Sequence, residues 1–221
     1  MAFPHAFPHA FPRLHVVTDT APGVDTITAV HAALSAGAPL IQVRPDDRDT
    51  DRAAYDLALH VAELCARYDA TCLVNDLLHV ALAIGAHGAH VGAEDLPVDA
   101  ARRILGPAAI LGGTCRDPDA ARAAQRAGAS YLGVGPAHAS STKDGLPEPL
   151  GAEGIRGVAE AVDIPVVAIG GITPERVPAL LAAGAHGVAV IAAVSRAADP
   201  ARATRAFLDA LSTVNPAGAA R

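Results

Sequence analysis

The sequence contains no tryptophan, and aromatic residues make up only 3% of its 221 residues. Hydrophobic residues nevertheless reach 51%, so the core must be built from alanine, valine, leucine and isoleucine. Layered helices and parallel strands suit such a core. The length is normal for one α/β barrel, and we therefore expect a single folded domain.

Cysteine is also scarce. The three cysteines, Cys65, Cys72 and Cys115, are too few and too irregularly spaced for a disulfide framework or a zinc site, which indicates a reducing interior. No apolar run approaches the roughly 18 residues of a membrane-spanning helix. The first residues lack the basic start and apolar stretch of a signal peptide. We expect a cytoplasmic protein.

Positive charge is not in excess, because the net charge is −6 and the isoelectric point is near 5.9. Nucleic acids and anionic membranes are bound by basic faces, so both are excluded as partners. The expected partners are small molecules, and any phosphate group must be held by a local site. The sequence leaves open whether copies of the chain associate into a homo-oligomer.

The chain begins with a four-residue repeat, M-A-F-P-H-A-F-P-H-A-F-P. Its prolines block a helix, and it is too short to bury a core of its own. We therefore expect residues 1–12 to be a disordered lead-in, residues 13–213 to form the folded domain, and residues 214–221 to be a flexible tail.

Short β-rich runs alternate with longer alanine-rich helical patterns from Leu14 onward. The predicted strands are Leu14–Thr18, Leu40–Arg44, Thr71–Asn75, Gly88–Val91, Ala109–Gly112, Tyr131–Val134, Pro165–Ile169 and Gly187–Ile191. The predicted helices are Val24–Ser35, Asp51–Tyr68, Leu77–Ile84, Val98–Ile104, Pro118–Ala127, Glu153–Ala161, Pro174–Ala183 and Ala201–Leu211.

Eight strand–helix units predict a (β/α)8 TIM barrel, whose active site lies at the C-terminal ends of the strands. A doubly wound sheet is the competing architecture. It would normally need only five or six strands and a G-x-G-x-x-G fingerprint, which is absent after the first strand.

The loop after the sixth predicted strand gathers three hydroxyl groups and one ammonium group past Gly135–Pro136. These are Ser140, Ser141, Thr142 and Lys143. Together with loop N–H groups, they predict an anion site. Gly170 and Gly171, after the seventh strand, add backbone N–H groups ahead of a helix, where an anion is also favoured. The end of strand eight offers only backbone amides.

Strand two carries Gln42 and Arg44 on one side, since side chains alternate along a strand. A buried arginine needs an anionic partner, either a protein carboxylate such as Asp19 or Asp76, or a substrate phosphate.

Asp76 and Asp95 follow the third and fourth strands. Carboxylates at adjacent strand ends can share a Mg²⁺ ion together with waters and substrate phosphates. By spacing alone, however, the favoured role of each aspartate is the N-cap of the helix that follows it.

Seven ordered stretches resemble those of thiamine phosphate synthase and its relative, the thiazole tautomerase. They are V-V-T-D (Val16–Asp19), I-Q-V-R (Ile41–Arg44), L-V-N-D (Leu73–Asp76), G-A-H-G-A-H-V-G-A-E-D-L-P (Gly85–Pro97), G-V-G-P (Gly133–Pro136), S-S-T-K (Ser140–Lys143) and A-I-G-G-I-T (Ala168–Thr173). The resemblance runs from about Leu14 to Leu211.

This resemblance implies a transfer reaction, in which a thiazole phosphate displaces diphosphate from a hydroxymethylpyrimidine diphosphate. It places Mg²⁺ on Asp76 and Asp95, and it makes Arg44 and Lys143 the catalytic cations. The pyrimidine diphosphate would be bound by Gln42, Arg44, Asn75, Thr114 and Lys143. The thiazole phosphate would be bound by Ser140, Ser141, Thr142, Gly171, Ile191 and Ala192.

Three departures from the family pattern keep two alternatives open. Asp46 stands where a lysine is usual and would repel a diphosphate, Leu77 stands for an arginine, and Ala192 stands for a phosphate-binding serine. They motivate a non-catalytic phosphate-binding barrel as one alternative. The other is a thiazole tautomerase, an isomerase in which His138 would act as the acid or base.

Overall fold

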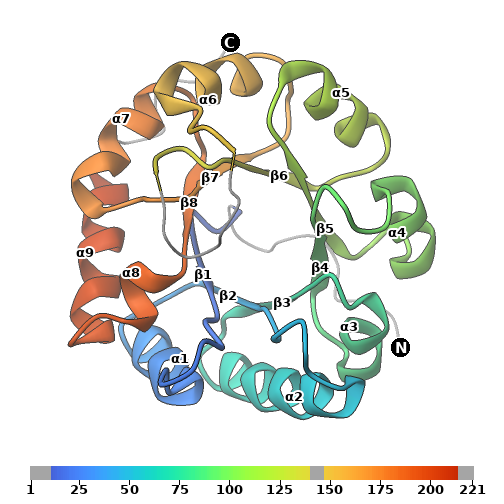
Figure 1. The fold of residues 1–221 in the computed structure, drawn as a ribbon, viewed down its shortest axis with the longest axis vertical. Helices are drawn as coiled ribbons and strands as arrows, with labels where there is room; N and C mark the ends of the chain where they lie inside the picture. Colours follow the sequence, from blue (N-terminus) through green and yellow to red (C-terminus); the bar gives the residue numbers. More distant parts are fainter. Residues whose placement is uncertain (1–10, 140–146, 214–221) are drawn as a thin grey trace.

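The computed structural model describes residues 11–139 and 147–213, which form a closed barrel of parallel strands ringed by helices (Figure 1). The strands pair in sequence order and β8 returns to β1, so the predicted TIM barrel is confirmed. Their bounds are β1 Leu14–Val17, β2 Leu40–Val43, β3 Thr71–Asn75, β4 Gly88–Val91, β5 Ile110–Cys115, β6 Tyr131–Val134, β7 Val166–Ile169 and β8 Gly187–Val190.

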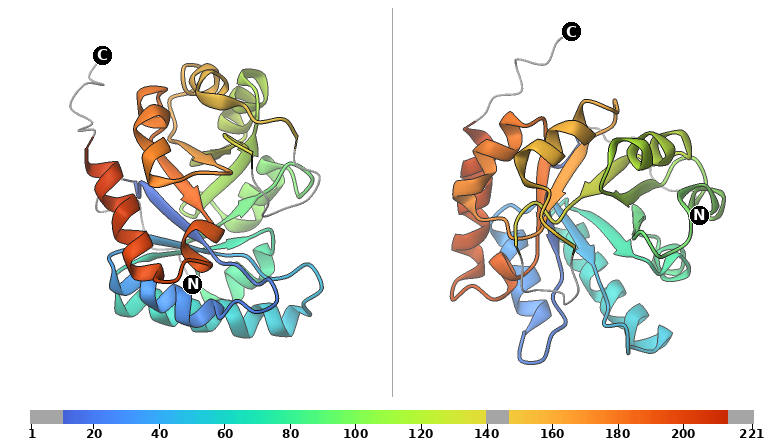
Figure 2. Two further views of the ribbon diagram at one scale, coloured as in Figure 1. Left: turned by 60° about the vertical axis from the view of Figure 1, so that its left-hand side comes forward. Right: turned by 45° about the horizontal axis from the view of Figure 1, so that its top comes forward.

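The helices lie outside the strands in both turned views (Figure 2). They are α1 Thr26–Ser35, α2 Asp51–Arg67, α3 Leu78–Ile84, α4 Val98–Leu105, α5 Pro118–Arg126, α6 Gly151–Ala159, α7 Val177–Ala182, α8 Ala192–Ser195 and α9 Pro200–Ser212, with a 3₁₀ turn at Pro174–Arg176. None of the helices in the described ranges is long and apolar enough to cross a membrane.

Two of the differences between the predicted and the observed elements bear on the site. The fifth strand continues to Cys115, so Thr114 belongs to a strand and not to the loop after it. A short helix, α8, follows β8 at Ala192, where no helix was predicted. Four residues are too short for a hydrophobic period to be recognised in the sequence.

The apolar residues form two cores, as a closed barrel requires. The larger core lies between strands and helices and includes the buried cysteines Cys65, Cys72 and Cys115, all of which are free. The smaller core fills the barrel itself, with Val17, Leu40, Leu73, Tyr131, Val167 and Ala189 buried together. The interior is therefore packed, and ligands must bind at its mouth.

Phe11 belongs to this interior packing, although the sequence pattern assigned it to the lead-in. Its ring lies 5.4 Å from His15, 5.1 Å from Tyr131 and 5.7 Å from His186, measured between ring centroids. The His186 ring nitrogen also lies 2.8 Å from the Phe11 carbonyl oxygen. The third copy of the F-P repeat thus packs against the barrel residues.

We expect Phe11→Ala to destabilise the protein by about 2 kcal/mol, because a half-buried aromatic ring is lost from a packed interior. For a chain of this size the Tm should fall by roughly 4–8 °C. Phe7→Ala, in the preceding copy of the repeat, is the matched control and should leave the Tm unchanged. Equal losses in both variants would contradict this assignment.

Candidate functional site

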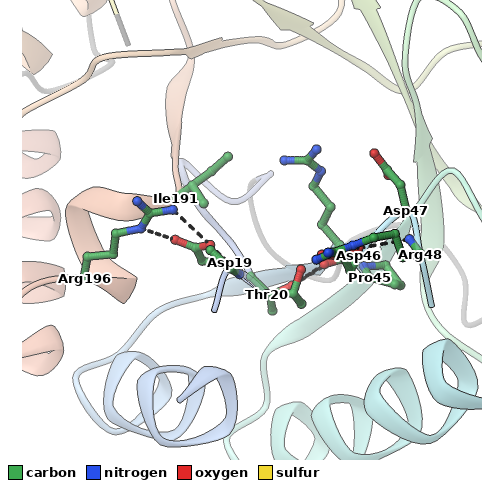
Figure 3. A pocket seen from close by; sticks show the side chains of 11 residues that line it. Asp19, Thr20, Pro45, Asp46, Asp47, Arg48, Ile191 and Arg196 are labelled. Atoms are coloured by element: carbon green, nitrogen blue, oxygen red, sulfur yellow. Dashed lines mark hydrogen bonds and ion pairs between the residues drawn. The ribbon is translucent and has the colours of Figure 1, made fainter. Parts of the chain in front are cut away.

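A cavity of about 340 Å³ opens beside the C-terminal ends of β1, β2 and β8 (Figure 3). Its lining is charged and comes from the loops that follow these strands. The lining residues are Thr18, Asp19, Thr20, Ala21, Arg44, Pro45, Asp46, Asp47, Arg48, Ile191 and Arg196. The position is that of a TIM-barrel active site.

Arg44 is half-buried, and its side chain belongs to the lining of this cavity. Its backbone N–H donates to the Thr18 hydroxyl over 2.8 Å, which ties the end of β2 to β1. Its side chain makes no hydrogen bond or ion pair with any other residue in the described ranges. A cation held in this way at a strand end is available to a ligand anion.

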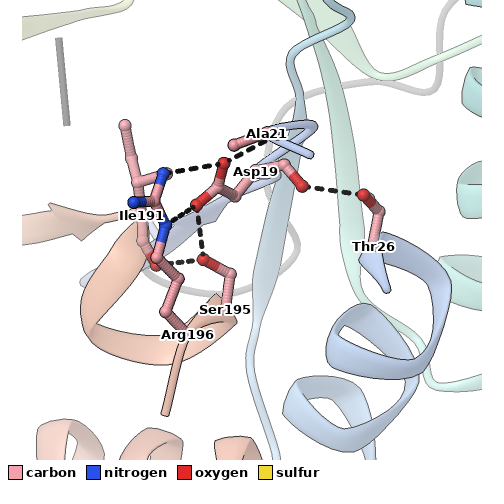
Figure 4. Close-up of polar contacts among 6 residues, drawn as sticks. All are labelled: Asp19, Ala21, Thr26, Ile191, Ser195 and Arg196. Atoms are coloured by element: carbon pink, nitrogen blue, oxygen red, sulfur yellow. Dashed lines mark hydrogen bonds and ion pairs between the residues drawn. The ribbon is translucent and has the colours of Figure 1, made fainter. Parts of the chain in front are cut away.

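Asp19 is not the partner of Arg44, so that alternative is wrong. The buried Asp19 carboxylate accepts from Arg196 Nε over 2.6 Å and from the Ser195 hydroxyl over 3.1 Å (Figure 4). Burial acts to raise the pKa of Asp19, but the hydrogen bonds from Arg196, from the Ala21 N–H and from Ser195 outweigh it, and the pKa is lowered. The pair joins the segment after β1 to α8, where the barrel closes.

Asp46 carries its own counter-charge, which changes the meaning of this departure from the family pattern. Arg48 donates to the Asp46 carboxylate through Nε over 2.7 Å and through the second guanidinium nitrogen over 2.9 Å. This bidentate pair holds the pKa of Asp46 well below its usual value. Arg48 lines the same cavity as Asp46. Its positive charge therefore offsets the negative charge of Asp46, which was expected to repel a diphosphate.

Asp76 and Asp95 face each other across the ends of β3 and β4. Burial, and then the neighbouring carboxyl group of Asp95, raise the pKa of Asp76 to about 7. Arg44 acts in the opposite direction from nearby. One oxygen of Asp76, Oδ1, is buried and has no hydrogen-bond partner among residues 11–139 and 147–213. Two adjacent carboxylates with an unsatisfied oxygen favour a cation between them.

Neither aspartate caps a helix, so the capping alternative is also wrong. The N-cap of α3 is Leu77 and that of α4 is Pro97. Asp95 instead accepts from the Gly92 N–H over 2.7 Å within its own loop. Asp76 adopts a left-handed backbone conformation with φ of 60°. It lies outside α3 and before the N-cap of that helix, so capping does not account for this conformation.

Gln42 and Asn75 extend the acidic pair into a polar chain along the mouth. Gln42 Nε2 donates to Asn75 Oδ1 over 2.8 Å, and the Asn75 amide in turn donates to Asp76 Oδ2. The structure therefore brings together four of the residues predicted from β2, β3 and the loop after β4, namely Gln42, Asn75, Asp76 and Asp95.

Thr114 lies at the end of β5, where its hydroxyl is 2.9 Å from His90 Nε2. His90 Nδ1 is 3.0 Å from the hydroxyl of Tyr131. Burial lowers the pKa of His90 to about 4, so the imidazole is neutral at physiological pH. His90 is thus a strand histidine with both ring nitrogens hydrogen-bonded, and sequence reasoning did not identify Tyr131 as a partner.

The remaining predicted site residues fall in two groups. Gly171 follows β7 with φ of 60°, and its N–H has no partner in the described part of the chain. Ile191 and Ala192 lie at the start of α8. Ser140, Ser141, Thr142 and Lys143 lie outside the described residues.

His138, proposed as the acid or base of the alternative isomerase, lies beside the Gly170–Gly171 turn. Its backbone N–H donates to the Gly170 carbonyl over 3.0 Å. Burial and the nearby Arg176 lower the pKa of its imidazole. Its side chain makes no hydrogen bond with any residue in ranges 11–139 and 147–213, so no carboxylate there orients the ring for proton transfer.

Two cavity arginines, Arg48 and Arg196, were missed by sequence reasoning. Arg48 is two residues from Asp46, and that spacing is a signal that could have shown the pair. Arg196 is separated from Asp19 by 177 residues, and only closure of the barrel brings them together.

Within the described ranges, no group of three or more His, Cys, Asp or Glu side chains is placed to hold a metal.

The closed barrel, with charged side chains lining a cavity at the C-terminal ends of its strands, defines a class of protein, the TIM barrels. The thiamine monophosphate synthase family model matches residues 14–194. Thiamine-phosphate synthase of Salinispora arenicola is 63% identical over 201 residues, covering 90% of this chain and 97% of that protein. The protein from Salinispora tropica, of the same name, is 61% identical over equal shares.

A solved structure agrees with these relatives. Thiamine phosphate pyrophosphorylase from Pyrococcus furiosus superposes with a TM-score of 0.83 at 35% identity, covering 91% of this chain and 96% of that one. The chain belongs to the thiamine monophosphate synthase family. It is a transferase of thiamine biosynthesis with thiamine-phosphate synthase activity, and neither the isomerase nor the non-catalytic barrel is favoured.

We expect Asp76→Asn to stabilise the protein at pH 8 in buffer free of divalent cations. The pKa of Asp76 is raised from 3.8 to about 7, so the folded state prefers the protonated form and loses stability as the pH rises through that range. Removing the charge should therefore raise the Tm by about 2–4 °C, equivalent to roughly 1 kcal/mol after allowing for solvent screening.

The gain should shrink toward pH 5, where Asp76 of the unaltered protein is already protonated. Asp99→Asn is the matched control, because Asp99 is exposed and its pKa is lowered by a hydrogen bond from Arg103. That variant should show no gain at either pH. A lower Tm for Asp76→Asn at pH 8 would contradict the repulsion between Asp76 and Asp95.

Proposed function

We propose that this site couples hydroxymethylpyrimidine diphosphate with a thiazole phosphate, in a reaction that requires Mg²⁺ and releases diphosphate. The observation that carries the proposal is the opposition of charges at the mouth. Among the described residues, the Arg44 guanidinium group has no hydrogen-bond or ion-pair partner. It lies near an acidic pair in which one buried oxygen also has no partner in those ranges.

Asp76 and Asp95 fit a divalent cation by their chemistry. Mg²⁺ prefers oxygen ligands and commonly takes one or two carboxylates, with waters and substrate phosphates completing its shell. The unpartnered Asp76 Oδ1 and the raised pKa of Asp76 are both relieved by a cation at this place. When bound, Mg²⁺ would neutralise charge on the departing diphosphate.

The chain's own residues supply the remaining electrostatics. The bond from the pyrimidine methylene carbon to the diphosphate oxygen breaks, and its electron pair leaves with the diphosphate. Arg44 stabilises that growing negative charge, and the resemblance to the family assigns Lys143 the same role. The lone pair of the thiazole ring nitrogen then forms the new carbon–nitrogen bond.

The other contacts orient the two substrates. Gln42, Asn75 and Thr114 present polar groups to the pyrimidine diphosphate from β2, β3 and β5. Gly171, Ile191 and Ala192, with Ser140, Ser141 and Thr142, are proposed to hold the thiazole phosphate. The N–H of Gly171, which has no partner in the part of the chain that the structure describes, supports this placement. No base of unusual pKa is needed, because orientation and electrostatics carry the reaction.

We expect the purified protein to release diphosphate only when both phosphorylated substrates and Mg²⁺ are present. Asp76→Ala and Asp95→Ala should each lower kcat by about a hundredfold or more, since each removes a charge that binds the cation. Asp99→Ala, an exposed aspartate on α4, is the control and should retain full activity. Equal rates with Mg²⁺ and with excess chelator would exclude the proposed role of the acidic pair.

Arg48 provides a second test, directed at the substitution of aspartate at position 46. We expect Arg48→Ala to raise KM for the pyrimidine diphosphate by about tenfold, because Asp46 is left unpaired beside the diphosphate site. Arg52→Ala is matched, as both side chains are highly exposed and each binds one aspartate. Steady-state kinetics should show no change for Arg52→Ala. Similar KM values for both variants would mean that Asp46 does not act on the ligand.

A further inference from the structure

Beneath the mouth, a buried hydrogen-bonded chain crosses β4, β5 and β6 inside the barrel. It runs from the Tyr131 hydroxyl to His90 Nδ1 over 3.0 Å, and from His90 Nε2 to the Thr114 hydroxyl over 2.9 Å. Tyr131 and His90 are only 1% and 8% exposed. Thr114 is half-buried and lies at the mouth end of the chain.

Two glycines make room for this chain. The register pairs His90 with Gly112 and Gly112 with Tyr131, so Gly112 lies between the two rings. A Cβ at Gly112 would collide with both His90 Nδ1 and the Tyr131 hydroxyl. A Cβ at Gly133 would come within 2.9 Å of His90 Cε1. The rings meet because the intervening strand positions carry no side chains.

The position of each hydrogen follows from the partners. The Tyr131 hydroxyl has one hydrogen-bond partner in the described part of the chain, His90 Nδ1. A buried phenol that failed to donate would leave its hydrogen unsatisfied. Burial raises the pKa of Tyr131 far above its ordinary value, so the proton is retained.

With Nδ1 accepting, the neutral imidazole carries its hydrogen on Nε2 and donates it to Thr114 Oγ1. The Thr114 hydroxyl hydrogen then has no acceptor among residues 11–139 and 147–213, so it is available to a ligand bound at the mouth. A diphosphate oxygen is acceptor-only, so it needs a donor at this position.

We propose that Tyr131 and His90 are positioning residues that fix the hydrogen-bond polarity of Thr114, so that its hydroxyl donates to an oxygen of the bound diphosphate. This inference rests on the proposed function for its ligand. Without the Tyr131 hydroxyl, the imidazole is free to take the other tautomer. Thr114 would then donate downward to His90 Nε2 and present only lone pairs to an anion.

Kinetics of Tyr131→Phe test this role. We expect kcat/KM for the pyrimidine diphosphate to fall about tenfold, the loss of one net hydrogen bond, with KM for the thiazole phosphate unchanged. Tyr68→Phe is the matched control: it removes a surface hydroxyl that contacts Ser35 and His31, and it should behave like the unaltered protein. Full activity of Tyr131→Phe would overturn the proposal.

A double-mutant cycle separates positioning from general damage to the barrel. Thr114→Val removes the hydroxyl, so adding Tyr131→Phe to it should cause no further loss. If the two losses instead multiply, Tyr131 does not act through Thr114 and the proposal fails.

The tautomer itself can be read without any activity. In ¹⁵N spectra of the imidazoles, with His90 assigned by its absence in His90→Gln, we expect an Nε2-protonated ring in the unaltered protein and a shift toward the Nδ1-protonated form in Tyr131→Phe. An Nδ1-protonated ring in the unaltered protein would refute the chain of donors. Failure of the unaltered protein to release diphosphate would refute the proposed function, while the tautomer would still be decided by these spectra.

Discussion

Strand alternation inside a closed barrel is the constraint on which the site depends. Eight short parallel strands leave space for only a few interior side chains from each, and those nearest the C-terminal ends meet at one mouth. Leu40 and Leu73 fill the centre, and two residues further along the same strands Gln42 and Asn75 are joined by a hydrogen bond. The same periodicity therefore gives a dry core below and a polar site above it.

Of the three arginines that line the cavity, Arg44 alone has no carboxylate partner among the described residues. Arg196 is held by Asp19, and Arg48 is held by Asp46, while Arg44 has no such partner in the described ranges. The paired arginines balance carboxylates that would otherwise repel a diphosphate. Arg44 remains free to act on a ligand, and the acidic pair is left to act on a cation. In the proposed function, a diphosphate and a cation bound together would satisfy the charges that Arg44 and the acidic pair leave unbalanced among the described residues.

Most of the fold was predictable because periodicity is a local property of the sequence. The strands Thr71–Asn75, Gly88–Val91 and Tyr131–Val134 were predicted at their observed bounds. Contacts made by barrel closure were not predictable in this way. The pair of Asp19 with Arg196 joins opposite ends of the chain, and the contact of Tyr131 with His90 depends on a register and on Gly112 between them. A single sequence shows which residues are polar, but not which of them meet.

The backbone conformation of Asp76 depends both on its own residue type and on contacts with neighbouring elements. Its φ of 60° is uncommon for a residue with a side chain, although aspartate tolerates this region better than most. Its N–H donates to the His90 carbonyl over 2.8 Å, and its carbonyl accepts from the Leu78 N–H over 2.9 Å, so both backbone groups are fixed by neighbouring elements. The carboxylate is thereby held against Asp95 despite their repulsion. Strain and repulsion at one residue, maintained by bonds on both sides, are expected where a site is organised in advance for a ligand that relieves them.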